Sequence, residues 1–164
     1  MKHPLEHEWT FWYYYPEKRQ SWSANQKMVL TVSTVEDFWA VYNNILQPSQ
    51  LKVNSDYSLF KSGIKPDWED LGNIHGGRWV TTCPRDRLDV GWKELVMALI
   101  GEQMGDGLRD TVTGAVVNVR SKGDKLAVWV GDDSDLVEAS VGVHISRILG
   151  LYEMRRLEYK RFKP

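Results

Sequence analysis

A dense aromatic run near the start of the chain constrains the fold more than any other feature. Seven aromatic residues fall between positions 9 and 22, and residues 9–15 read Trp-Thr-Phe-Trp-Tyr-Tyr-Tyr before Pro16. Large rings occupy odd and even positions alike, so both faces of the segment are aromatic, and such residues favour strands. The run therefore predicts a β-strand that closes at Pro16, and residues 28–32 (Met-Val-Leu-Thr-Val) predict a second strand.

Helical spacing appears in three later segments. Ser33 and Glu36 fit a capping box, with a hydroxyl at the N-cap and a carboxylate three residues on. Apolar residues then recur at intervals of three and four, here and twice more along the chain. The predicted helices cover residues 34–46, 89–105 and 133–149.

The remaining segments read as strands and loops. Residues 63–77 contain Pro66 and several glycines, which predicts a long loop, and long loops in compact domains are often functional. Strands and helices do not alternate strictly, which favours an α+β fold with an antiparallel sheet and helices packed on one face. We expect a single domain over residues 1–164. The further predicted strands cover residues 56–61, 78–82, 114–120, 125–130 and part of the stretch after 150.

Composition limits the classes of function. The formal net charge is −1 and the pI is about 6.4, so any contact with nucleic acid must be local. No apolar stretch approaches the ~18 residues of a membrane helix, and the first residues do not read as a secretory signal. One cysteine, Cys83, excludes an internal disulfide. We expect a cytoplasmic or nuclear protein with no membrane partner.

Catalytic motifs are missing from the sequence. It contains no phosphate-binding loop motif, no dinucleotide-binding glycine motif, no HExxH and no GxSxG. The four histidines lack metal-ligand spacing, and Cys83 has no neighbouring base in the sequence. We therefore expect no catalytic residue, no metal and no enzymatic activity.

The hairpin predicted around residues 121–124 carries cations. A four-residue turn places Arg120 opposite Lys125, with Asn118, Ala127 and Trp129 on the same face. Lys122 in the turn adds a third cation, and a glycine-containing turn can also present backbone N–H groups to an anion. The residues alone leave two interpretations open, a solvated turn or a phosphate site beside a tryptophan.

Two tryptophans read as exposed. Trp68 lies between acidic residues in a proline-bounded loop, and Trp22 lies between serines in a polar turn. Such an indole is either a plug for its loop or a platform on which a base stacks. Glu69 can accept two hydrogen bonds, which suits the N1–H and N2 amino edge of guanine. Two such indoles could sandwich a base, and a cationic base would gain further from cation–π attraction.

Taken together, the motifs resemble the eukaryotic translation initiation factor 4E family, whose members bind the mRNA cap. The resemblance covers roughly residues 3 to 150 and fades after Gly150. The matching segments are His3-Pro4-Leu5, Thr34-Val35-Glu36-Asp37-Phe38-Trp39, Asp56-Tyr57-Ser58-Leu59-Phe60-Lys61, Gly63-Ile64-Lys65-Pro66 with Trp68-Glu69-Asp70, Gly76-Gly77-Arg78-Trp79, Leu99-Ile100-Gly101-Glu102, and Gly114-Ala115-Val116-Val117-Asn118-Val119-Arg120 with Lys122-Gly123-Asp124-Lys125.

This resemblance implies a curved antiparallel sheet of about eight strands, backed by three long helices on its convex face. It also implies a ligand, the 7-methylguanosine triphosphate cap, with no cofactor and no reaction. Trp22 and Trp68 would sandwich the methylated guanine, Glu69 would accept from its edge, and Trp129 would lie against the N7-methyl group. The cations expected at the cap phosphates are Arg78, Arg120, Lys122 and Lys125.

A second surface follows from the resemblance. Family members bind a helical peptide with a Tyr-x-x-x-x-Leu-apolar pattern, from the scaffold factor 4G or from repressor proteins, on the helical side. Lys93 stands where the family usually has a leucine of the peptide-binding groove. The resemblance therefore does not carry the family's usual affinity for these partners over to this chain. The matching positions, which we name the partner surface, are His3, Pro4, Leu5, Val35, Trp39, Glu94 and Met97.

Several functions stay open at this point. The leading one is a monomeric initiation factor that binds capped mRNA and recruits a scaffold protein. A close alternative is a cap-binding repressor or stage-specific isoform with weakened scaffold binding. A cap-hydrolysing enzyme and a sugar-binding module are disfavoured, the first because no acidic metal-binding run exists. The basic last stretch, which holds Arg155, Arg156, Lys160, Arg161 and Lys163, is either a solvated end or a contact for RNA phosphates.

Overall fold

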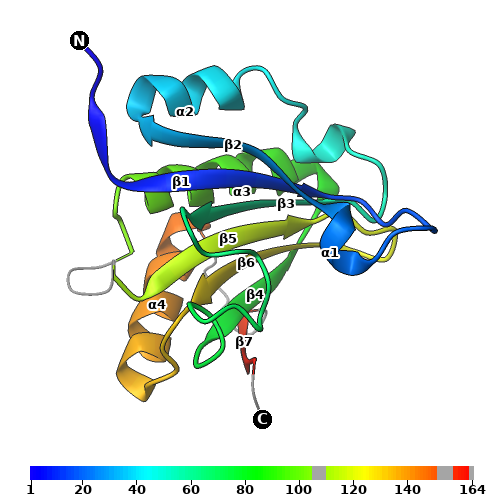
Figure 1. The fold of residues 1–164 in the computed structure, drawn as a ribbon. Coiled ribbons are helices and arrows are strands. Elements are labelled where there is room, and N and C mark those ends of the chain that lie inside the picture. Colours follow the sequence, from blue (N-terminus) through cyan, green and yellow to red (C-terminus); the bar gives the residue numbers. More distant parts are fainter. Residues whose placement is uncertain (105–109, 151–156, 163–164) are drawn as a thin grey trace.

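The computed structural model describes residues 1–104, 110–150 and 157–162, and these form one antiparallel sheet with helices on one face (Figure 1). The sheet order is β2-β1-β3-β5-β6-β4-β7. The predicted α+β class is confirmed, with seven strands in the described part of the chain rather than about eight. The strands are β1 (Pro4–Tyr14), β2 (Gln26–Thr34), β3 (Asp56–Lys61), β4 (Gly77–Cys83), β5 (Val112–Asn118), β6 (Asp124–Val130) and β7 (Leu157–Arg161).

Three helices cover one face of the curved sheet, and a short one lies at its end. Their apolar residues join the sheet in one core, in which Phe38, Trp92 and Val141 are fully buried. Burial of side chains this large is the main stabilising term of the fold. The helices are α1 (Trp22–Asn25), α2 (Val35–Tyr42), α3 (Arg85–Ile100) and α4 (Asp135–Ile148), with a 3₁₀ turn at η1 (Pro48–Gln50).

The cap of α2 differs from the predicted one. Thr34, not Ser33, is the N-cap residue, and its hydroxyl accepts from the backbone N–H of Asp37 at 3.1 Å. Glu36 does not complete a capping box, because its carboxylate accepts from the backbone N–H and contacts the ring of His3. The helix also ends at Tyr42, four residues earlier than predicted, and the side chain of Asn44 donates back to the last turn.

The hairpin register also differs from the predicted one. Asn118, not Arg120, lies opposite Lys125, so residues 119–124 form the turn and Arg120 falls inside it. The backbone N–H of Arg120 donates to the carboxylate of Asp124 at 2.8 Å, and this bond closes the longer turn. Gly123 has a φ of 138°, a conformation that side-chain-bearing residues rarely adopt. Arg120 and Lys125 are therefore not directly opposite each other across the ladder, contrary to the prediction from a four-residue turn.

Candidate functional site

The helix-free side of the sheet carries a second, smaller aromatic cluster. Trp129 is 9% exposed and packs edge-on against Phe60, with ring centroids 5.2 Å apart. Phe162, just after β7, covers it from the other side at 4.5 Å. Arg78 faces Trp129 across the β4–β6 ladder, so its side chain lies on this same side. We call this side of the sheet, together with α1, the loop 62–76 and the turn 119–124, the aromatic face.

The loop 62–76 is held rigid by a buried amide. Asn73 is fully buried, and its side-chain amide donates to the backbone carbonyls of Lys65 at 3.0 Å and Asp67 at 2.9 Å. Asp70 accepts from the backbone N–H of Lys65 at 3.0 Å and from that of Gly72 at 2.9 Å. These bonds satisfy backbone groups that a loop this long would otherwise leave to water. The segment that presents Trp68 is therefore preorganised.

Trp22 and Trp68 are the exposed indoles of the aromatic face. Trp22 begins α1, where Ser21 caps the helix, and its ring lies 6.0 Å from that of Tyr14. The two indoles are 46% and 43% exposed, which is unusual for side chains of this size. A hollow of about 110 Å³ separates α1 from the loop that carries Trp68, and it is lined by Trp12, Trp22, Ser23, Gln26, Lys65, Pro66 and Asp67.

Of the acids beside Trp68, Glu69 alone leaves its carboxylate free. Asp67 accepts from the backbone N–H of Glu69 at 3.0 Å, and Asp70 is used in the loop as described above. Glu69 is exposed, and its side chain makes no hydrogen bond or ion pair with any residue that the structure describes. A free carboxylate next to an exposed indole can accept two hydrogen bonds from a ligand's edge.

Buried polar contacts also fix the turn 119–124. Asp124 is buried and accepts from the Arg85 guanidinium, with an Nη2–Oδ1 distance of 2.9 Å, and from the backbone of Arg120. Burial alone would raise the pKa of Asp124, but these bonds outweigh it and hold the pKa below its usual value. The Arg120 guanidinium pairs with Asp56 at 2.9 Å, whereas burial keeps the pKa of Asp56 raised.

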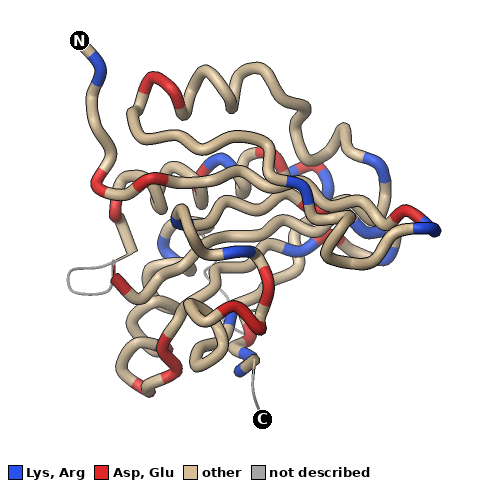
Figure 2. The backbone as a smooth tube through the Cα atoms, viewed as in Figure 1, with Lys and Arg blue, Asp and Glu red and all other residues tan. Residues whose placement is uncertain are grey.

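Cations surround this turn, and several have no acidic partner. Lys122 and Lys125 are exposed, and neither is paired in the part of the chain that the structure describes. Arg78 is half-buried, equally without a described carboxylate, and burial lowers its pKa. Figure 2 shows Lys and Arg from several segments gathered at the end of the sheet where α1 and this turn lie. Arg120, Lys122 and Lys125 thus lie in or next to this turn, whereas Arg78 lies opposite Trp129, four residues along β4 from the residue that pairs with Lys125.

The partner surface lies around α2 and α3. His3 contacts Glu36 through its ring, and the hydrogen bond from that ring lowers the Glu36 pKa to about 2. The backbone N–H of Val35 donates to the His3 carbonyl at 2.8 Å, which ties the start of β1 to α2. Glu94 is exposed on α3, and the apolar side chains that this surface leaves exposed are Pro4, Val35 and Met97.

Lys93 takes part in this surface. Its ammonium group lies 5.7 Å from the ring centroid of Trp39, which is a cation–π contact. Trp39 is only partly buried and packs edge-on against Phe38 and Tyr42, at 5.0 and 5.6 Å. Lys93 therefore adds a cation to a ring that is already packed against two aromatic neighbours.

Sequence reasoning missed several residues of the aromatic face. Trp12 and Gln26 line the hollow beside Trp22, and Phe162 covers Trp129. Strand alternation puts Trp12 on the face of β1 opposite to that of Phe11 and Tyr13. Nothing in the local sequence shows which of the two faces of this strand lies against α1. The position of Phe162 could not be predicted without the register of β7 against β4, because that pairing is a long-range property of the sheet.

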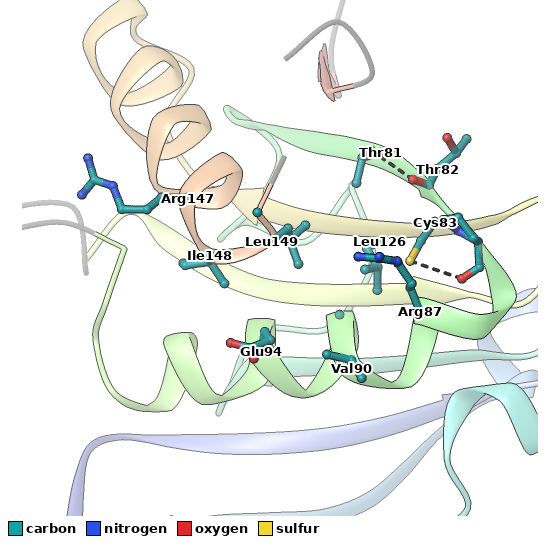
Figure 3. A pocket seen from close by; sticks show the side chains of 13 residues that line it. Thr81, Thr82, Cys83, Arg87, Val90, Glu94, Leu126, Arg147, Ile148 and Leu149 are labelled. Carbon is teal, nitrogen blue, oxygen red and sulfur yellow. Dashed lines mark hydrogen bonds between the residues drawn. The ribbon is translucent and has the colours of Figure 1, made fainter. Parts of the chain in front are cut away.

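A larger cavity lies on the helical side, between the end of β4 and the helices α3 and α4 (Figure 3). Its volume is about 450 Å³, and Cys83, Arg87 and Arg147 lie on its lining. Burial raises the Cys83 pKa to about 11, so the thiol stays protonated at neutral pH. Of the sequence-predicted site residues, Glu94 alone lines this cavity, so it is separate from the tryptophan site.

No helix among the described residues has the length and apolar character needed to cross a membrane. Within residues 1–104, 110–150 and 157–162, no group of three or more His, Cys, Asp or Glu is arranged to hold a metal ion.

Comparison with known proteins identifies relatives over most of the chain. The model of the family "Eukaryotic initiation factor 4E" matches residues 4–164. The prediction that the resemblance fades after Gly150 was therefore wrong. Eukaryotic translation initiation factor 4E-1A of Danio rerio is 44% identical over 152 residues, which cover 90% of this chain and 69% of the relative. The factor 4E-3 of Caenorhabditis elegans is 41% identical over 170 residues, which cover 99% and 67%.

Solved structures agree. The complex of Caenorhabditis elegans eIF4E-3 with the 4E-binding protein Mextli and a cap analog has a TM-score of 0.94 at 42% identity, covering 98% of this chain and 93% of that one. Ascaris suum eIF4E-3 with an m2,2,7G cap gives 0.93 at 41% identity, covering 98% and 92%. Sequence and fold point the same way: the chain belongs to the eukaryotic initiation factor 4E family.

Proposed function

We propose that this chain binds the 7-methylguanosine cap of mRNA, with the base held between Trp22 and Trp68. The observation that carries the proposal is a pair of exposed indoles, with Trp22 on the lining of one hollow and Trp68 on the loop that lines the hollow's other side. The free carboxylate of Glu69 comes next in sequence after Trp68. Methylation at N7 makes guanine cationic, so stacking on indole gains a cation–π contribution. Glu69 accepts from the N1–H and N2 amino group, and this charge-assisted pair selects guanine.

The triphosphate would lie along the cations near the turn 119–124. Lys122 and Lys125 are unpaired and can turn to the phosphates, and Arg78 lies behind them on the same face. Arg120 is oriented by Asp56 and offers its remaining N–H groups. Trp129 is covered by Phe162, so it would meet the N7-methyl group with one edge of its ring.

The partner surface would bind a helix with the Tyr-x-x-x-x-Leu pattern, from the scaffold 4G or from 4E-binding proteins. Two observations support this: relatives are known in complexes with Mextli and with 4E-BP, and Val35 and Met97 are exposed apolar side chains on adjoining helices. The Lys93 contact with Trp39 favours the second candidate, a cap-binding repressor or isoform that holds the usual scaffold weakly.

The remaining parts of the proposal concern the protein as a whole. We infer one cap-binding domain over residues 1–164 that acts as a monomer in the cytoplasm and binds the cap without transforming it. Incubation with capped RNA and magnesium tests the last point, because any turnover would contradict it.

Tryptophan fluorescence tests the binding proposal directly. Titration with 7-methyl-GTP should quench emission saturably, whereas GTP at the same salt concentration should bind far more weakly. Trp68→Ala and Glu69→Ala should each remove most of the affinity, because each deletes a contact of about 1–3 kcal/mol. Trp39→Ala, on the partner surface, serves as the matched control and should leave cap affinity unchanged. Equal binding of both nucleotides would refute the proposal.

A further inference from the structure

One row of side chains leads from Trp129 to the edge of the sheet. Trp129 on β6 lies opposite Arg78 on β4, and Arg78 lies opposite Lys160 on β7. Residues directly opposite one another share a face, so all three project from the aromatic face. Strands are spaced by about 4.8 Å, which places Lys160 about 10 Å from Trp129, measured between Cα atoms.

The pairing of Arg78 with Lys160 is electrostatically unfavourable as it stands. Like charges directly opposite across a ladder repel, and Arg78 has no carboxylate partner among the described residues. Among the described residues, Lys160 pairs only with Glu158, at 3.9 Å, and both side chains are more than half exposed, so this pair is weak. An anion lying over the row would relieve the repulsion.

Next to this row, residues of β4, β6 and β7 line a shallow hollow of about 200 Å³. Lys125 at the start of β6 and Lys160 on β7 both line it, together with Val80, Thr81, Thr82 and Glu158, the acid that pairs weakly with Lys160. Lys125 is one of the cations that we assign to the cap phosphates. The hollow therefore connects the proposed phosphate site with Lys160.

Arg161, the next residue, behaves differently. Its guanidinium pairs with Asp133 at 3.4 Å, and β-strand alternation sends it to the helical side, as it does Tyr159, which packs on Trp79. Lys160 therefore projects from the aromatic face with a weak acidic partner, whereas Arg161 is paired with Asp133 on the helical side.

We propose that Lys160, together with Arg78, holds the phosphates of the RNA that follows the cap. The proposal rests on the proposed cap-binding function and extends it from the cap to the RNA body. The ligand is a single-stranded RNA backbone, read by charge and not by sequence. The row then explains how a chain with a net charge of −1 can hold RNA along one local track.

The experiment compares two ligands at several salt concentrations: 7-methyl-GTP, and a capped oligonucleotide about ten residues long. For the unmodified protein, the slope of log affinity against log salt should be steeper with the oligonucleotide. Lys160→Ala should lower oligonucleotide affinity about two- to five-fold at low salt and reduce that slope by about 0.7, the value for one phosphate contact on a single strand. Affinity for 7-methyl-GTP should change less than two-fold.

Two further variants control for structure. Arg161→Ala removes a charge one residue away and should leave the slope unchanged, whereas Lys160→Arg should restore it. Equal slopes for Lys160→Ala and the unmodified protein would overturn the proposal. Failure of the cap-binding function would look different, because 7-methyl-GTP would then bind no better than GTP. In that case the slope measured with uncapped RNA still decides whether Lys160 contacts phosphate.

Discussion

The aromatic face and the partner surface are built in opposite ways. On the aromatic face, Trp68, Glu69 and Lys122 stand on loops, and the buried polar groups Asn73 and Asp124 fix those loops. On the partner surface, Val35, Glu94 and Met97 stand on regular helices, and the polar contacts around them are themselves exposed, as in Lys2 with Asp37. The first surface is preorganised for one rigid ligand, and the second can adapt to different helical partners.

The largest loss of stability is expected when the buried amide of Asn73, which fixes the loop 62–76, is removed. Asn73→Ala leaves the Lys65 and Asp67 carbonyls without donors, and we expect a loss of about 3 kcal/mol in the free energy of unfolding. Affinity for 7-methyl-GTP should fall as well, because Trp68 is no longer held. Denaturant unfolding and fluorescence titration measure the two effects.

The matched control is Asn44→Ala, which removes an exposed amide that donates to the Ala40 carbonyl. It should cost less than about 1 kcal/mol and leave the cap affinity unchanged. If the two variants lost the same stability, the contrast between a clamped loop and an exposed helix end would be wrong.

The next largest effect is expected for Asp124→Asn, which should lower the free energy of unfolding by about 2 kcal/mol at neutral pH. The substitution removes the charged acceptor that Arg85 and the backbone N–H of Arg120 both use. The folded pKa of Asp124 is below its unfolded value of about 3.9, so its stabilisation is present above that pH. It is lost as the pH falls through the folded pKa.

The difference in unfolding free energy between the unmodified protein and Asp124→Asn should therefore be constant from pH 7 to about pH 5 and shrink towards zero in acid. Subtraction removes the opposite contribution of Asp56, whose pKa is raised. Asp86→Asn, an exposed acid in the first turn of α3, provides the control. A difference that does not depend on pH would contradict the assigned role of Asp124.

The cap of α2 gives a smaller effect and separates the predicted residue from the observed one. Thr34→Ala should cost about 1 kcal/mol, because the hydroxyl that accepts from Asp37 is lost. Ser33→Ala should stay within about 0.5 kcal/mol. Thermal or denaturant unfolding of both variants measures this, and a larger loss for Ser33→Ala would restore the capping box that the sequence suggested.

These cases show what local pattern could and could not supply. β3 was located residue for residue at 56–61, and the helix predicted at 133–149 was found as α4 within two residues at each end. The helix predicted at 89–105 instead begins at Arg85 and ends at Ile100, because periodicity fixes the buried face of a helix but not its ends. The cap of α2 was misplaced by one residue, since two neighbouring hydroxyls compete and the ring of His3 draws Glu36 away. Deciding between such alternatives needs the tertiary contact, which lies 33 residues away in sequence.

The candidate site divides along the same line. Residue type and spacing singled out Trp22, Trp68 and Glu69, and the structure adds the hollow between α1 and the loop. Spacing alone misjudged Arg120, because the length of a turn depends on side chains such as Asp124 that satisfy its backbone. Phe162 could not be placed either, since its contact with Trp129 depends on the pairing of β7 with β4.

The smallest expected effect concerns the partner surface. The ammonium group of Lys93 lies over the ring of Trp39, so an apolar side chain of a docking helix must displace it and lose a contact of about 0.5–1 kcal/mol. Lys93→Leu should therefore bind a Tyr-x-x-x-x-Leu-apolar peptide about two- to five-fold more tightly by calorimetry. Lys93→Arg keeps the cation and should not gain affinity, and cap binding should be unchanged in both variants. If Lys93→Leu gained nothing, the cation would not restrict this surface, and the initiation factor would be favoured over the weak-scaffold isoform.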